Sequence, residues 1–172
     1  SSANANVSVL SRYVEQGAKL VGIEPSCILS FSDDYLDMMD SNGQRAKAEA
    51  IAKNTMLVEQ FVRYAIEEEG ATLDLDGSKL PDKLMLHGHC HQKALVGTGS
   101  AMSVLNAIEG CNVEEIPSGC CGMAGSFGFE EEHYDISMSI GEQTLFPAIR
   151  DQSGDFAVVA EGVSCRQQIQ DG

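Results

Sequence analysis

Apolar residues that recur at steps of three and four along much of the chain predict amphipathic helices. The clearest pattern covers residues 44–69, where Ile51, Phe61 and Ile66 share one apolar face, and Gly70 is expected to end this single long helix. The same spacing predicts further helices over residues 4–19, 32–39, 98–109 and 130–149, the last of them kinked or restarted at Pro147.

Short continuous apolar runs lie between the helical patterns and have the length of buried strands. They cover residues 19–24, 83–86, 112–116 and 156–160. Because strand and helix patterns alternate, the sequence predicts βαβ repeats. The expected fold is α/β, with a mainly parallel sheet of about four strands flanked by helices and joined by right-handed crossovers.

Most of the cysteines come directly after these predicted strands. Since the carboxyl ends of parallel strands share one edge of a sheet, we expect their thiols to lie together although they are far apart in sequence. Thiolates gathered from successive loops bind a metal ion or an iron–sulfur cluster. The residues concerned are Cys27, Cys90, Cys120, Cys121 and Cys165, whereas Cys111, in a turn without a neighbouring cysteine or histidine, is expected to be structural.

Residues 117–128 form a glycine-rich loop that contains two adjacent cysteines. Gly119, Gly122 and Gly125 are expected to allow positive φ angles and close approach of the backbone to a bound group. Adjacent cysteines rarely form a disulfide with each other, so joint ligation of one metal centre is their natural use. Two alternatives are a phosphate-binding loop, although the P-loop and dinucleotide motifs are absent, and a pair of buried structural thiols.

Three histidines and a cysteine crowd the end of the second predicted strand, within residues 87–91. Imidazole and thiolate are the side chains that bind zinc and iron most readily. We expect Cys90 to be a ligand, with His89 and His91 as further candidates. Residues 130–133, Glu-Glu-Glu-His, are interpreted as charge at the start of a helix, where carboxylates interact favourably with the helix dipole.

Composition narrows the classes of partner. The 172 residues carry a formal net charge of −15, which argues against nucleic acid and anionic membrane surfaces as partners. No apolar run approaches the roughly 20 residues of a transmembrane segment. An export signal is not visible, so we expect a cytoplasmic protein, or one held at a membrane through a partner, whose cysteines serve as metal ligands and not as disulfides.

A weak internal repeat suggests how the chain is organised. Residues 21–27 and 159–165 both end a predicted strand in Ser-Cys. We therefore expect residues 1–30 to be the tail of a preceding repeat, 31–82 a helical connector and 83–172 a complete repeat. All three are expected to form one compact domain overall, with the natural start of the protein upstream.

Three motifs together resemble a known family. They are His-Cys-His-Gln-Lys at 89–93, Ser-Gly-Cys-Cys-Gly-Met-Ala-Gly-Ser-Phe-Gly at 118–128 and Ser-Cys-Arg-Gln-Gln-Ile at 164–169. They resemble the cysteine-rich CCG domain that occurs in heterodisulfide reductase, in the iron–sulfur subunits of glycolate oxidase and anaerobic glycerol-3-phosphate dehydrogenase, and in lactate-utilisation proteins. The motifs are most similar to the C-terminal part of fused flavin and iron–sulfur oxidases that act on D-2-hydroxy acids.

The resemblance implies a set of ligands and one departure from it. Cys90, Cys120, Cys121 and Cys165 match family ligands, which in heterodisulfide reductase bind a non-cubane 4Fe-4S cluster, and Cys27 resembles the last cysteine of the preceding repeat. Gly162 stands where the family has the first cysteine of a Cys-x-x-Cys pair. Four thiolates would still hold an ordinary 4Fe-4S cluster or a tetrahedral zinc ion, and a histidine of residues 87–91 could replace one of them.

The resulting hypothesis is an iron–sulfur electron-transfer module of a flavin-linked 2-hydroxy-acid dehydrogenase or oxidase of the lactate or glycolate type. FAD would be bound by another part of the full protein, and the partners would be flavin-binding and ferredoxin-like domains or subunits. One alternative is a non-catalytic docking domain, zinc-bound or metal-free. Another is thiol–disulfide exchange by Cys120 and Cys121. No catalytic residue for the substrate reaction is assigned.

Overall fold

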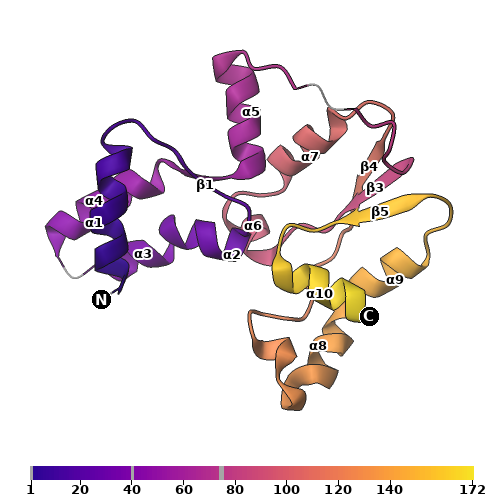
Figure 1. Ribbon diagram of the computed structural model, residues 1–172. Helices are drawn as coiled ribbons and strands as arrows, with labels where there is room; N and C mark the ends of the chain where they lie inside the picture. The colour runs from indigo at the N-terminus through magenta and orange to yellow at the C-terminus, as the bar shows by residue number, and fades with distance from the viewer. Residues whose placement is uncertain (1, 40, 74–75) are drawn as a thin grey trace. The chain divides into compact units, whose positions relative to one another are not determined.

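The computed structural model describes residues 2–39, 41–73 and 76–172, and the chain divides into two compact units, Ser1–Phe61 and Val62–Gly172 (Figure 1). Each unit contains a small parallel sheet with helices, so the predicted α/β class is confirmed. The predicted boundaries at residues 30 and 82 stay predictions. Among the described residues, no helix is both long enough and apolar enough to cross a bilayer.

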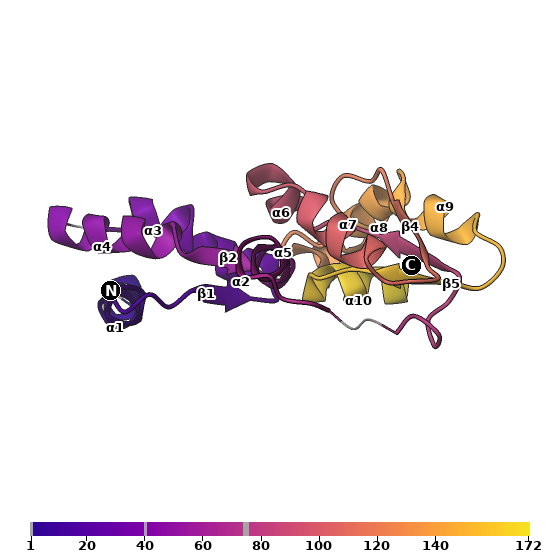
Figure 2. The same cartoon turned by 90° about the horizontal axis from the view of Figure 1, so that it is seen from above.

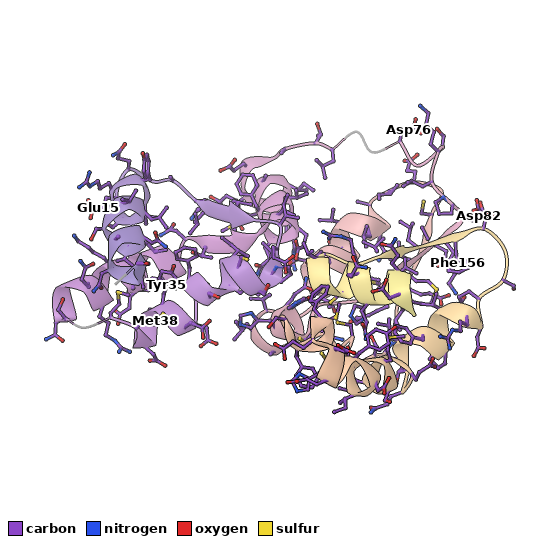
Figure 3. All side chains as sticks on the ribbon, turned by 60° about the horizontal axis from the view of Figure 1, so that its bottom comes forward. Glu15, Tyr35, Met38, Asp76, Asp82 and Phe156 are labelled. Atoms are coloured by element: carbon purple, nitrogen blue, oxygen red, sulfur yellow. The ribbon has the colours of Figure 1, made fainter. Side chains whose placement is uncertain are left out.

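The first unit is built around two helices, α1 (Ser2–Val14) and α4 (Asn42–Ala52), which pack on each other. Val7 of α1 is fully buried against Ala48 and Ile51 of α4. Tyr35, labelled in Figure 3, packs on the same cluster, and its ring centroid lies 4.3 Å from that of Phe31. The remaining elements of this unit are β1 (Leu20–Gly22), α2 (Pro25–Ile28), η1 (Leu29–Phe31), α3 (Asp34–Asp37) and β2 (Thr55–Leu57).

The prediction of one continuous helix over residues 44–69 is wrong, because the helix is interrupted in its middle. The chain forms α4, then the strand β2, then α5 (Val58–Glu69), and β2 pairs in parallel with β1. The Asn54 side-chain amide donates to the carbonyl of Ala50, and the Thr55 hydroxyl donates to that of Ile51, both at 2.9 Å. These bonds satisfy the last carbonyls of α4 and so end the helix. Gly70, at φ +67°, does end α5 as predicted.

The second unit contains a three-stranded parallel sheet in the order β4-β3-β5, which can be followed in Figure 1. The strands are β3 (Lys83–Leu86), β4 (Asn112–Glu115) and β5 (Phe156–Val159), as the apolar runs predicted. Leu86 at the end of β3 is paired with Glu115 and with Val159, so the three strands end level with one another. The candidate site residues that follow these three strands in sequence therefore start from the same edge of the sheet.

Helices cover this sheet and complete its core. The apolar cluster contains Met85, Ile116, Leu145 and Phe146, and the thiols Cys121 and Cys165 belong to it. Pro147 lies in the first turn of α9 (Leu145–Arg150), where its missing N–H costs no hydrogen bond, so the predicted restart of the helix there is confirmed. Both ribbon views show β5 leading into α10 (Val163–Asp171) (Figures 1 and 2). The helical elements that follow α5 in this unit are α6 (Cys90–Leu95), α7 (Gly99–Asn106), η2 (Phe127–Phe129), η3 (Glu131–His133), α8 (Tyr134–Gly141), α9 (Leu145–Arg150) and α10 (Val163–Asp171).

Candidate metal centre

Cysteines follow the ends of all three strands, β3, β4 and β5, at one edge of the sheet. Cys90 is the first residue of α6, shortly after β3, and Cys165 lies in the first turn of α10, after β5. Cys120 and Cys121 lie in the glycine-rich loop after β4. Because parallel strands end at a common edge, side chains as distant in sequence as positions 90 and 165 are brought into one site.

The four thiols form a continuous row. Cys90 interacts with Cys120, Cys120 with Cys121, and Cys121 with Cys165, each through a side-chain hydrogen bond. Cys90 is exposed and Cys120 half-buried, whereas Cys121 and Cys165 are 3% and 2% exposed. The row thus runs from the surface into the core. All four are free thiols, which leaves their sulfurs available as ligands.

Cys27 belongs to the other unit. It is exposed and lies in α2 of the unit formed by residues 1–61, after β1. Cys111 precedes β4, at the opposite end of the strand from the row, and its Sγ donates to the carbonyl of Pro81 at 3.5 Å. The structure therefore brings together four of the five thiols that the strand pattern singles out.

The surroundings of Cys90, Cys120 and Cys121 raise the pKa of these three thiols. Burial raises the pKa of Cys90, with a further contribution from the neighbouring Cys120. The hydrogen bond with Cys121, followed by burial, raises the pKa of Cys120. For Cys121, the hydrogen bond with Cys120 lowers the pKa, but the bond with Cys165 and burial outweigh it and raise the pKa to about 11. A metal ion that binds here must therefore displace protons.

The glycine-rich loop has a backbone that few other residues could adopt. Gly122 has φ +108°, and a Cβ there would collide with the carbonyl oxygen of Ser137 in α8. Gly125 has φ +70° in open space, and Gly119 has no steric need for glycine. The N–H of Gly122 donates to Cys120 Sγ at 3.3 Å. Such backbone donors to sulfur are a feature of cysteine-ligated metal sites.

His87 is a site residue to which the sequence reasoning gave no individual role. It is 1% exposed, and Nδ1 lies 2.7 Å from the Ser118 hydroxyl. Nε2 is buried and has no hydrogen-bond partner among the residues that the structure describes. One ring nitrogen of His87 lies within 4.8 Å of the sulfurs of Cys121 and Cys165. Its position directly after the central strand β3 is the signal that could have identified it.

Electrostatics keep the His87 ring neutral. Burial, and then the positive charge of Lys93, lower the pKa of His87 to about 4. At neutral pH the imidazole therefore carries a lone pair on one nitrogen, which is the form that binds metals. Lys93 itself ties α6 to the glycine-rich loop, because its Nζ donates to the carbonyls of Ser118 and Gly119.

His89 has two roles in the structure. It is the N-cap of α6, where Nδ1 accepts from the N–H of His91 at 3.2 Å and its own N–H donates to the Gln92 side chain at 3.1 Å. Its ring also lies against Gly162. A Cβ on Gly162 would collide with His89 Cδ2 and would lie 3.2 Å from His89 Nε2 and from Cys165 Sγ. The imidazole therefore occupies the space that a cysteine side chain at position 162 would need.

Of the other predicted residues, His91 is half-buried at the second position of α6, and its backbone N–H is engaged with His89. Residues 131–133 form η3, ahead of α8, as charge at a helix start would. His133 pairs with Glu130 at 2.9 Å and stacks on Phe127 at 4.0 Å between ring centroids. These contacts belong to the surface of the helix start.

Comparison with known proteins relates the chain to oxidoreductases. It is 27% identical over 168 residues to D-2-hydroxyglutarate dehydrogenase of Pantoea ananatis, covering 97% of this chain and 15% of that protein. It is 29% identical over 157 residues to one subunit of the anaerobic glycerol-3-phosphate dehydrogenase of Escherichia coli, covering 90% of this chain and 37% of that subunit. Lactate utilization protein A of Exiguobacterium sp. is 26% identical over 153 residues, covering 87% and 59%.

The chain is therefore similar to parts of larger redox proteins, and it spans less than two thirds of each relative. No family model matches it, and no solved structure matches it. The relatives include the glycerol-3-phosphate dehydrogenase and lactate-utilisation classes that the CCG-like motifs resemble, and the cysteine and histidine side chains form a group that could hold a metal ion.

The residues present fit a thiolate-bound metal centre. Four thiols are in contact, a backbone N–H donates to one of the sulfurs, and a buried imidazole nitrogen is left without a partner among the described residues. A buried polar atom without a partner is costly unless something binds to it. A cation coordinated by the sulfurs would also displace the protons that the raised pKa keeps on Cys90, Cys120 and Cys121.

Proposed function

We propose that the chain is the iron–sulfur electron-transfer module of a flavin-linked 2-hydroxy-acid dehydrogenase or oxidase. FAD and the flavin-binding and ferredoxin-like domains or subunits would belong to the rest of the enzyme, in the reducing cytoplasm, which keeps thiols free. The observation that carries the proposal is the row of four thiols from three strand ends. Similarity to D-2-hydroxyglutarate dehydrogenase and lactate utilization protein A supports the hydroxy-acid class.

The chain's own residues would hold and tune the centre. Cys90, Cys120, Cys121 and Cys165 would be the ligands of a 4Fe-4S cluster. When bound, such a cluster takes up and releases single electrons at a potential set by hydrogen bonds to sulfur and by burial. The N–H of Gly122 would stabilise negative charge on Cys120. The buried end of the row excludes water, and the exposed Cys90 leaves the other end accessible to a redox partner.

A zinc-stabilised docking domain is the second candidate. His87, Cys121 and Cys165 present one ligand atom each within 4.8 Å of one another, which is the compact grouping that a single ion needs. The glycine at position 162, where the resembled family has a cysteine, also suits a smaller ligand set. A structural zinc would contribute to folding and would carry no electrons.

Thiol–disulfide exchange by Cys120 and Cys121 is disfavoured by the electrostatics. Reactive exchange requires a thiol whose pKa is near or below the ambient pH, because the thiolate is the nucleophile. The pKa of Cys120 is raised, and that of Cys121 is raised to about 11. Both thiols are therefore protonated and poorly nucleophilic unless a cation binds.

Metal analysis of the full-length protein distinguishes these functions. The protein is purified without oxygen, and its iron, acid-labile sulfide and zinc are measured together with its visible absorption before and after dithionite. The proposal predicts iron and sulfide in similar amounts and absorption that bleaches on reduction. Zinc without iron, with stability lost on chelation, would select the docking domain. Protein free of both metals after anaerobic reconstitution would refute both.

A further inference from the structure

The buried nitrogen of His87 has no role in the fold that the structure describes. The ring is 1% exposed, and Nε2 lacks a hydrogen-bond partner among the described residues. Most buried polar side-chain atoms in folded proteins are paired, so an exception calls for an explanation, such as a bound ion. The sulfurs of Cys121 and Cys165 lie within 4.8 Å of a ring nitrogen of His87.

The contacts around His87 hold the ring in one orientation. Its backbone N–H donates to the carbonyl of Val159 at 2.9 Å, which fixes the residue at the end of the sheet. Its Nδ1 lies 2.7 Å from the hydroxyl of Ser118, which is itself buried. A histidine that binds a metal through one nitrogen usually has the other nitrogen tied to a polar partner. Ser118 fills that position, and Nε2 is left for the metal.

His89 differs from His87 because contacts within the fold account for the position of its ring. Its Nδ1 caps α6 by accepting from the N–H of His91. The ring also fills the space beside Gly162. Both features account for its burial without a metal. For His87, the Ser118 contact explains only one nitrogen.

We propose that His87 is a ligand of the metal centre through Nε2, together with Cys121 and Cys165, so that the centre is a mixed thiolate–imidazole site. The inference rests on the proposed function in that it requires a bound metal, but it holds for iron or for zinc. Because imidazole is neutral, a His87 ligand gives the centre a higher reduction potential than a thiolate at the same position would give.

Nitrogen ligation can be detected directly in the full-length protein loaded with iron. Pulsed EPR of the reduced cluster is recorded on protein that carries ¹⁵N-labelled histidine and on unlabelled protein. We expect a hyperfine coupling that changes with the isotope. The coupling should vanish in His87→Cys, whose thiol can keep the iron in place, and the midpoint potential of that variant should be lower. It should persist in His91→Ala, the matched control four residues along the chain, in α6.

The outcomes separate the inference from the proposed function. An iron-loaded wild type without a histidine coupling, or a coupling that persists in His87→Cys, would overturn the role of His87 and leave the iron–sulfur module intact. If the protein carries zinc, X-ray absorption should show a nitrogen ligand that His87→Cys removes. That result would support the role of His87 and would contradict the electron-transfer function. Wild-type protein that takes up neither metal would refute both.

Discussion

The ring of His89 fills the space beside Gly162 that any larger side chain at position 162 would need. Gly162 is the N-cap of α10 with φ −67° and ψ 130°, angles that every residue can adopt, so the backbone itself does not require glycine. The constraint comes from the collision of a Cβ with His89 Cδ2. The two positions are thus coupled through packing, and a cysteine at 162 requires the imidazole to move.

This coupling predicts the effect of restoring a cysteine. Gly162→Cys should lower the free energy of unfolding by about 1–3 kcal/mol through overpacking. The loss should be smaller in a His89→Ala background, where the ring is absent. Urea unfolding of the two single variants and the double variant measures the coupling. Gly99→Cys is the control, because a Cβ at Gly99 meets nothing within 4 Å. Equal losses for Gly162→Cys and Gly99→Cys would contradict the account.

Two glycines of the loop that carries Cys120 and Cys121 allow a second prediction. Gly125→Ala should cost about 1–2 kcal/mol of unfolding free energy, because its φ of +70° strains a side chain that otherwise has room. Gly122→Ala should cost clearly more, since its φ of +108° is combined with a collision at the carbonyl of Ser137. Denaturant unfolding compares them. A Gly122→Ala variant as stable as Gly125→Ala would show that the loop does not pack on α8 as described.

At the scale of elements, the apolar runs predicted the four strands β1, β3, β4 and β5 because a buried parallel strand is apolar on both faces. The parallel topology then implied that cysteines after β3, β4 and β5 would meet. What periodicity could not distinguish was β2, because its three residues, Thr-Met-Leu, lie between two helical patterns and keep their spacing. Asn54 and Thr55, both poor helix formers, were the available signal.

The details of the site were beyond the sequence for a different reason. Which histidine of residues 87–91 faces the sulfurs depends on ring orientation, and spacing alone gives no information on it. His87 is oriented by Ser118, a residue of another loop, and His89 by the start of α6 and by Gly162. Contacts of this kind exist only once the three strand ends have been assembled.

The break between α4 and α5 has a test in which two accounts predict opposite signs. Alanine is the better helix former, so in one continuous helix Thr55→Ala would raise stability by roughly 0.5 kcal/mol. In the structure, Thr55 belongs to β2, and its hydroxyl donates to the carbonyl of Ile51. We therefore expect a loss of about 1 kcal/mol in the free energy of unfolding. Lys47→Ala, at an exposed site inside α4, is the control and should be nearly neutral.

At the scale of the whole molecule, the chain is an acidic, two-unit segment that is similar to parts of larger redox proteins. The unit formed by residues 62–172 contains all four thiols of the row. Cys27 and Cys111 lie outside the row, one in each unit. They are therefore internal controls for every experiment on cysteine.

The iron content of a set of cysteine-to-serine variants tests the central claim most directly. Each variant is made in the full-length protein, purified without oxygen and analysed for iron and sulfide per chain. We predict that serine at position 90, 120, 121 or 165 removes most of the iron, whereas Cys27→Ser and Cys111→Ser retain the wild-type content. Wild-type iron in any of the four row variants, or an equal loss in the two controls, would contradict a shared centre.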